Sequence, residues 1–359
     1  MDLDTMKGTV QGYFDRAFTE IADTEYETPL ANSEMGVKAK LAPKNGTFVQ
    51  FRVLGELPLS VMTTSDSPQM YNDDEEPASA MVFQDDAFQV SLQELAGFLE
   101  LRPRLIEQDP ADMLPLTKKR LVTWARRMIH TVVNDRMVVP CGLAMTNLSN
   151  TYVKAPAPFR TIYAGGVAGF SALKADSFLT LADIVRASAL LRNGNVPLIN
   201  DRVVCVIDSA GIQQLTLGDS KFMDAIKRVE DSSQKMFASG SAVDYAGVAF
   251  RVQSDGYRCK LPSEGGVLET RKNTGKVRVC HLFGANSFGY LDLGEAGSEQ
   301  RKLLAPSFKV QDITVTGNKV TCALRFPMQA MVTVRDFGVN LAFTSAFDET
   351  VADLPDETA

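Results

Sequence analysis

A long run of hydrophobic residues at helical spacing constrains the fold of this chain most. Asp109 and Pro110 are favoured at the start of a helix, and Pro140 ends it. A helix over about 110–139 is on the order of 30–40 Å long, so the rest of the chain has to supply an apolar surface of similar length. The apolar residues that recur at three- and four-residue steps, and so share one face, are Leu116, Leu121, Trp124, Ala125, Met128, Ile129, Val132 and Val133.

The same predicted helix carries an excess of positive charge. Residues 116–136 include one acidic residue, Asp135, and six basic ones: Lys118, Lys119, Arg120, Arg126, Arg127 and Arg136. A solvated face of an amphipathic helix is the plainer interpretation of this charge. The alternative is an electrostatic surface that faces phosphate groups without reading a nucleotide sequence.

A long acidic segment lies between two predicted strands. Alternating apolar and polar side chains predict a half-buried strand over residues 47–54, and the pattern returns at 88–92. Residues 46–90 contain eight acidic residues and one basic residue. Because loops longer than about 12–15 residues are usually functional or disordered, we expect a projecting hairpin. The acidic run at its tip is Asp73, Asp74, Glu75 and Glu76.

The remaining patterns predict an N-terminal arm and a mixed α/β block. Residues 1–45 show little periodicity, which is typical of an extended segment that lies on another surface. Helices are expected at 180–191, 209–215 and 222–229, and buried strands at 203–207, 248–252 and 277–283. Residues 141–178 are expected to be loop-like. Towards the C-terminus, Gly317 and Asn318 predict the turn of a further hairpin, and strand patterns follow at 331–334 and 339–343.

The sequence predicts no catalytic, cofactor-binding or metal site. Its two histidines, His130 and His281, lack a second ligand at metal-binding spacing, and its five cysteines are far apart. His130 is expected on a helix face, and His281 within a strand, where it is either packed or at an edge. The glycines of 165–169 do not have the spacing of a phosphate-binding loop.

The net charge of −7 argues at first against a nucleic-acid partner. However, the segment 46–90 accounts for all of it, so the rest of the chain is neutral and includes the basic helix. The N-terminus carries charges where a signal peptide is apolar, and no stretch approaches the roughly 20 apolar residues of a membrane span. We therefore expect a protein that begins in a cytosol and has no membrane partner.

The order of these segments resembles the HK97-type major capsid proteins of tailed phages. Two local stretches are similar to the phage N4-type capsid subfamily. One is TFVQFRVLGELP, residues 47–58, and the other is TLADIVRASALLRNGNVPLINDRVVCVIDSAGIQQL, residues 180–215. The resemblance implies an α+β, HK97-like capsid fold. Its parts would be an N-terminal arm (1–45), an extended β-hairpin loop (46–91), a peripheral domain (92–165 and 310–359) with a spine helix at about 110–139, and an axial α/β domain (166–309).

The resemblance also implies a function. The chain would form hexamers and pentamers of itself in an icosahedral shell around the double-stranded DNA of a tailed bacteriophage. It would assemble in the host cytoplasm and end in the virion, and it would need no cofactor. A decoration or cement protein and a portal protein are further partners that the resemblance allows.

Particular residues follow from this expectation. The hairpin would contact a neighbouring subunit through Phe51, Asp73, Asp74, Glu75, Glu76 and Phe88. The basic helix face of Lys118, Lys119, Arg126 and Arg127 would meet packaged DNA or the acidic loop of a neighbour. Two alternatives stay open: an encapsulin-type compartment, which encloses cargo proteins, and a soluble α/β enzyme, against which the scarcity of histidines argues.

Overall fold

The structure is a computed structural model, and the part of the chain that it describes has several gaps. The described residues are 29–31, 35–39, 48–54, 85–101, 113–140, 144–146, 152–154, 157–218, 220, 243–245, 247–254, 256–272, 275–291, 307–312 and 320–347. The acidic tip at residues 73–76 and the helix expected at 222–229 lie outside the described residues.

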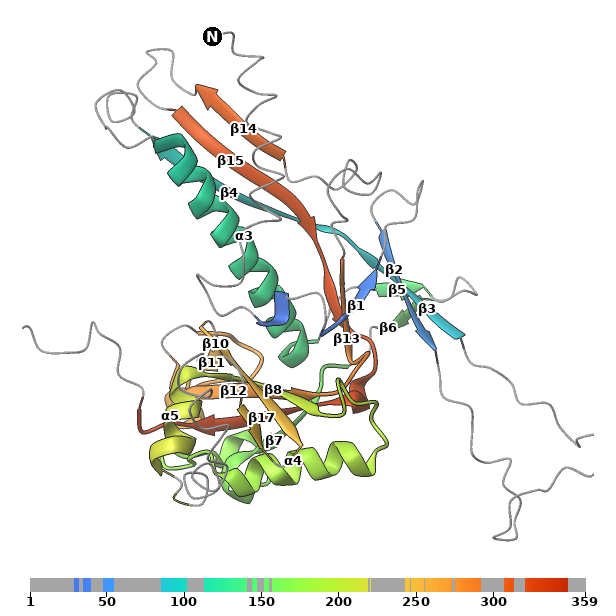
Figure 1. Cartoon of the computed structure of the whole chain (residues 1–359), viewed down its shortest axis with the longest axis vertical. Helices are drawn as coiled ribbons and strands as arrows, with labels where there is room; N and C mark the ends of the chain where they lie inside the picture. The colour runs from blue at the N-terminus through green and yellow to red at the C-terminus, as the bar shows by residue number, and fades with distance from the viewer. Residues whose placement is uncertain are drawn as a thin grey trace, which may run out of the picture.

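The upper body in Figure 1 is a long helix that lies along a three-stranded antiparallel sheet. The helix is α3 (Met113–Val138), and the sheet has the order β14 (Ser307–Asp312), β15 (Val320–Met328), β4 (Gln93–Leu101). Trp124 of α3 meets Phe326 of β15 edge to face, with ring centroids 6.2 Å apart. Gly97 of β4 lies under Trp124, where a Cβ atom would come within 2.7 Å of the indole ring. The sheet therefore supplies the apolar surface that the helix requires.

The helical pattern of the sequence is confirmed in α3. Five of its buried apolar residues recur at four-residue steps: Leu121, Ala125, Ile129, Val133 and Met137. They pack in one hydrophobic core with Leu324 and Met328 of the sheet and with Leu30 of η1 (Pro29–Ala31). Among the helices that the structure describes, none combines the length and the apolar character needed to cross a membrane.

The lower body is a seven-stranded mixed sheet with helices against it (Figure 1). The strand order is β7 (Arg160–Tyr163), β17 (Gly338–Thr344), β12 (Val277–Phe283), β8 (Val203–Asp208), β10 (Val248–Gln253) and β9 (Val243–Tyr245). The seventh strand, β11 (Tyr257–Cys259), pairs with the first half of β12. The pairs β7–β17 and β8–β10 are parallel, and the others are antiparallel. We call this body the axial body, after the expected axial domain (166–309) that contains most of its strands.

Two helices pack on one face of this sheet. They are α4 (Leu181–Asn193) and α5 (Ser209–Gly218), whose Leu191 and Leu215 share a core with Cys205 and Phe343. A Cβ atom on Gly211 would lie 2.7 Å from Ile207 and 2.8 Å from Phe343, so glycine lets α5 approach the sheet closely.

The helix predicted at 180–191 begins with a capping box. Thr180 accepts a hydrogen bond from the backbone of Asp183 at 3.4 Å, and the Asp183 carboxylate accepts one from the backbone of Thr180 at 3.2 Å.

Smaller sheets lie where the two bodies meet. One has the order β1 (Val37–Ala39), β13 (Phe288–Leu291), β16 (Ala330–Val332), and two are hairpins, β2 (Phe48–Leu54) with β3 (Asp85–Ser91) and β5 (Ala144–Thr146) with β6 (Tyr152–Lys154). Short 3-10 helices complete the described elements: η3 (Ala164–Gly166), η4 (Phe170–Ala172), η5 (Pro262–Glu264) and η6 (Arg335–Phe337).

The structure departs from the expected domain boundaries in two places. The strands β7 and β17 were expected in the peripheral domain, but both pair within the axial sheet. Every residue of β17 is buried, so its apolar run predicts a strand covered on both faces without indicating which sheet it joins. The segment 141–178, expected to be loop-like, contains β5, β6 and β7, each only three or four residues long.

Candidate functional site

The base of the predicted hairpin is formed by β2 and β3. Their antiparallel register runs from Phe48 opposite Ser91 to Leu54 opposite Asp85, with Phe51 opposite Phe88. The prediction of two paired strands is confirmed. The acidic tip lies beyond the last described pair.

Phe51 is buried within the subunit that contains it. Its side chain is 1% exposed, and its ring lies over Gly289 of β13, where a Cβ atom would come within 2.6 Å of Cδ1 and Cε1. Val49 and Val90 are also buried in the same core. This arrangement corrects the expectation that Phe51 contacts a neighbouring subunit, because Phe51 has no surface left for one. Instead, Phe51 fixes the base of the hairpin. The side chain of Phe88 lies outside the described part.

The basic residues of α3 lie mainly away from its buried stripe. Arg120 is exposed, and Arg126 and Arg127 are half-buried and take part in interactions of their own. Lys118 and Lys119 lie on the same helix, but their side chains fall outside the described part. Whether this face meets DNA or a neighbour stays a prediction.

The C-terminal half of α3 is joined to the axial sheet by buried polar side chains. His281 of β12 lies between Asn340 of β17, at 2.8 Å from Nδ1, and Asn134 of α3, at 2.5 Å from Nε2. Asn340 donates to the backbone oxygens of Met137 at 2.8 Å and Phe159 at 3.4 Å. Because hydrogen-bonded polar groups are stable in a core only when their partners are in place, these contacts fix where the helix sits on the sheet.

A charged contact reinforces this joint from the segment 256–272. Arg271 forms an ion pair with Asp135 of α3 at 2.6 Å and also lies over the ring of Tyr257, 5.9 Å from its centroid. Burial raises the pKa of Asp135, and Arg271 opposes that effect. Burial likewise raises the pKa of Tyr257, whose hydroxyl donates to Leu268 O at 2.8 Å. The segment 256–272 therefore holds the end of α3.

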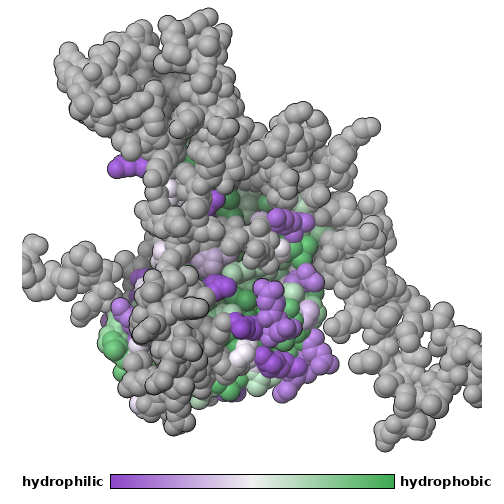
Figure 2. Space-filling view, viewed as in Figure 1, coloured by the Kyte–Doolittle hydropathy of each residue, from purple (hydrophilic) through white to green (hydrophobic). Residues whose placement is uncertain are grey.

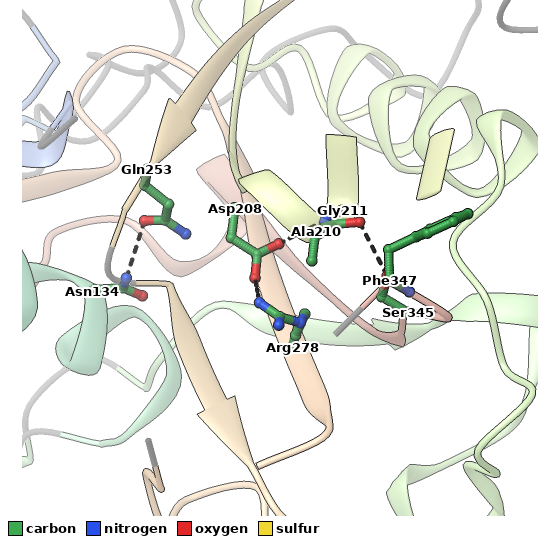
Figure 3. Close-up of polar contacts among 8 residues, drawn as sticks. All are labelled: Asn134, Asp208, Ala210, Gly211, Gln253, Arg278, Ser345 and Phe347. Atoms are coloured by element: carbon green, nitrogen blue, oxygen red, sulfur yellow. Dashed lines mark hydrogen bonds and ion pairs between the residues drawn. The ribbon is translucent and has the colours of Figure 1, made fainter. Parts of the chain in front are cut away.

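A buried ion pair joins two strands inside the axial sheet (Figure 3). The Asp208 carboxylate, at the end of β8, pairs with Arg278 of β12 and accepts a hydrogen bond from Gly211 N at 3.0 Å. Asp208 thus caps α5 as well as neutralising Arg278. Figure 3 also shows Ser345 donating to Ala210 O at 3.1 Å and Asn134 donating to Gln253 at 3.1 Å.

The cysteines of the axial body are suited to packing. Cys205, Cys259 and Cys280 are buried free thiols. Burial raises the pKa of Cys259 to about 12 and also raises that of Cys280, so neither is a ready nucleophile. Within the described ranges, no group of three or more His, Cys, Asp or Glu side chains could hold a metal ion.

Two surfaces remain open in the described structure. On the sheet face opposite α3, the side chain of Phe98 is 72% exposed, beside exposed Ala96 and Arg325. Figure 2 shows hydrophilic side chains gathered on the axial body near the end of α4. The exposed polar residues of that region are Arg192, Asn193, Asn195, Asn200, Asp201 and Arg202.

The buried polar contacts between α3 and the axial sheet, made by His281, Asn134 and Asn340, were not predicted from the sequence. We call these contacts the polar joint. A signal for it existed, because His130 and Asn134 interrupt the apolar stripe of the helix one turn apart, and His281 and Asn340 interrupt two apolar strands. Their partnership could not be read, because the contacts join residues 59 and 147 positions apart.

Comparison with known proteins shows a likeness in structure and none in sequence. No protein-family model and no curated protein matches the chain. The capsid of Ralstonia phage GP4 matches with a TM-score of 0.58 at 12% identity, over 86% of each chain. The capsid of cyanophage Pam1 matches at 0.53 and 13%, over 84% of this chain and 86% of that one. The acid-stable capsid of Helicobacter pylori bacteriophage KHP30 matches at 0.54 and 12%, over 85% and 86%. The chain therefore shares its fold with chains of these phage capsid structures.

Proposed function

We propose that this chain is a major capsid protein that self-assembles into the icosahedral shell of a tailed bacteriophage and encloses its double-stranded DNA. The observation that carries the proposal is the fold, which matches three phage capsid structures over 84–86% of the chain. In this proposal the protein is an HK97-type subunit with no catalytic role. We further propose that it is related to the phage N4-type subfamily, which the resemblance of residues 47–58 and 180–215 supports. It is found in hexamers and pentamers in the virion after assembly in the host cytoplasm.

The base of the hairpin supports this proposal, because it is buried in the core of its own subunit. The side chains that lie in this core are Phe51, Val49 and Val90, while the sequence beyond Leu54 is polar and acidic. In the proposed shell the tip lies over a neighbouring subunit. The tip residues Asp73, Asp74, Glu75 and Glu76 then make the contact, and Phe88, in the base of the hairpin opposite Phe51, adds to it.

Two surfaces of the described structure suit such a neighbour. The open sheet face around Phe98 offers apolar area beside Arg325. The basic side of α3, with Arg120 and Arg127 and the helix positions Lys118, Lys119 and Arg126, offers positive charge. Opposite charges steer association and set register more than they add affinity. If the acidic tip of one subunit pairs closely with the basic side of α3 in another, fewer basic residues are left to contact DNA.

The assembly test uses the purified full chain. Sedimentation velocity and negative-stain imaging should show closed polyhedral shells, and light scattering should show assembly that slows as salt rises. Neutralising the tip (Asp73→Asn, Asp74→Asn, Glu75→Gln, Glu76→Gln) should slow assembly and reduce its salt dependence. A chain that stays monomeric under all conditions would contradict the proposal.

A matched control separates the tip from net charge. Asp176, Asp201 and Glu264 are exposed acidic residues of the axial body. Replacing them with Asn, Asn and Gln removes three negative charges, against four in the tip variant, and assembly should keep its rate and its salt dependence. Equal effects of the two sets would refute the role of the tip. Shells that enclose protein cargo and no DNA would identify an encapsulin-type compartment instead.

A further inference from the structure

Both histidines of the chain are buried next to the C-terminal half of α3. His130 lies on the helix and His281 on β12, and each is 0% exposed. Asn134, which contacts His281, follows His130 by one helical turn. Histidine is the side chain whose ordinary pKa lies nearest neutrality. The joint between the long helix and the axial sheet therefore contains both of these groups.

The orientation of Asn340 fixes one proton of His281. The Asn340 Nδ2 group donates to two backbone oxygens, those of Met137 and Phe159. Its Oδ1 atom must then face His281 Nδ1, at 2.8 Å. An amide oxygen only accepts, so Nδ1 of the ring carries a hydrogen.

The other side of the ring is arranged for a second proton. Asn134 Oδ1 lies 2.5 Å from His281 Nε2, while Asn134 Nδ2 donates to Gln253 Oε1 at 3.1 Å (Figure 3). With Nδ1 already a donor, an oxygen at Nε2 can form a hydrogen bond only if Nε2 is protonated too. This arrangement of amides therefore matches the charged imidazolium ring.

A neutral ring requires two of these amides to be reversed. Asn134 Nδ2 would then donate to Nε2, and Asn134 Oδ1 would accept from Gln253 Nε2. In the present orientation Gln253 Nε2 is buried and has no hydrogen-bond partner among the described residues, so the reversal would provide one. Because the two ends of a side-chain amide have nearly the same shape, the same residues can complete the contacts in both protonation states.

The charged groups Asp135, Asp208 and Arg251, on elements packed against His281, are paired or have interactions of their own. On α3, Asp135 is paired with Arg271 of the adjoining segment, and on β8, Asp208 is paired with Arg278 of β12. On β10, Arg251 has interactions of its own, and the contact from β17 is the neutral Asn340. Burial lowers the pKa of His281 to about 4, Arg271 acts in the same direction, and the Asn340 hydrogen bond opposes both. The ring is thus neutral near pH 7 and takes up its proton in acid.

We propose that the joint between α3 and the axial sheet is a proton-operated switch. Protonation of His281 reverses the amides of Asn134 and Gln253 and loosens the hold of the sheet on the helix. The loosening follows because a positive charge placed in a fully buried site is opposed by desolvation, which is relieved when the helix moves away. The inference concerns a single chain and does not depend on the proposed capsid function.

The test measures hydrogen exchange of the full chain between pH 7 and pH 4, corrected for the intrinsic pH dependence of exchange. Amides of residues 129–138 should lose protection as a single proton binds to His281. Their exchange should become about tenfold faster for each pH unit below the pKa that His281 has when the helix has moved away from the sheet. Amides of β8 (Val203–Asp208) serve as the internal reference and should change little.

Three variants assign the effect to His281. His281→Gln should remove the selective loss of protection, and His130→Gln should retain it. Asn134→Asp places a carboxylate beside Nε2 and should move the midpoint upward by one pH unit or more. The ring carbon NMR shifts of His281 in labelled protein give the midpoint directly, whatever the stability of His281→Gln. A wild-type chain without a selective loss, an unshifted midpoint in Asn134→Asp, or the same loss in His281→Gln would overturn the proposal.

Discussion

Replacing Gly289 with alanine should detach the base of the hairpin from the rest of the subunit. The new Cβ atom would lie 2.6 Å from two ring carbons of Phe51 and 3.2 Å from the backbone oxygen of Val37, whereas carbon atoms pack best at about 3.5–4.0 Å. The Phe51 ring is fully buried, so it has to move by about 1 Å into side chains that already surround it. Overpacking of this kind lowers the free energy of unfolding by about 1–3 kcal/mol.

Urea unfolding of the unassembled chain measures this loss, and light scattering measures its effect on assembly. Phe51→Leu removes the ring that clashes, so the double variant should recover part of the loss, with a coupling free energy of about 1–2 kcal/mol. Gly169→Ala is a matched control, because nothing lies within 4 Å of its added Cβ, and it should stay within about 0.5 kcal/mol of the wild type. The reasoning is refuted if Gly289→Ala is no more destabilised than Gly169→Ala, or if Phe51→Leu does not relieve it.

Three other predictions follow from the described contacts. Asp208→Ala should lower the free energy of unfolding by about 3–5 kcal/mol, because Arg278 loses its buried carboxylate partner. The control Asp336→Ala removes an exposed pair with Arg160 and should cost less than about 1 kcal/mol in the same thermal unfolding measurement. The pKa of His281 is about 4 in the folded chain against an ordinary 6.5. The contribution of His281 to the free energy of unfolding is therefore complete above pH 6.5 and should fall by about 3 kcal/mol as the pH drops to 4. Urea titrations of His281→Gln should not show this fall. Phe98→Ser should leave the stability of the subunit within about 0.5 kcal/mol, because the side chain is exposed, but should raise the protein concentration needed for assembly in sedimentation assays.

Much of the local structure could be predicted because it depends on residues close together in sequence. The spacing of Leu121, Ala125 and Ile129 gave the long helix, and the alternation around Phe51 gave a hairpin strand. The hydrophobic pattern of residues 180–191 likewise predicted α4. Each of these signals spans a few residues and has a direct physical cause.

The arrangement of these elements could not be predicted in the same way. Every residue of β17 is buried, and nothing in its sequence indicates that it lies between β7 and β12. Phe51 has the pattern of a half-buried strand residue, but its burial depends on the absence of a side chain at Gly289, far away in sequence. The polar joint around His281 depends on Asn134 and Asn340 in the same way.

The most direct test of the proposed function is cryo-electron microscopy of the native particle that contains this chain, combined with nuclease treatment. We expect a closed icosahedral lattice of this subunit in hexamers and pentamers, with each hairpin lying over a neighbour and nuclease-resistant double-stranded DNA inside. A particle without icosahedral order, or a chain that is found only as a free monomer with turnover of a small molecule, would contradict it.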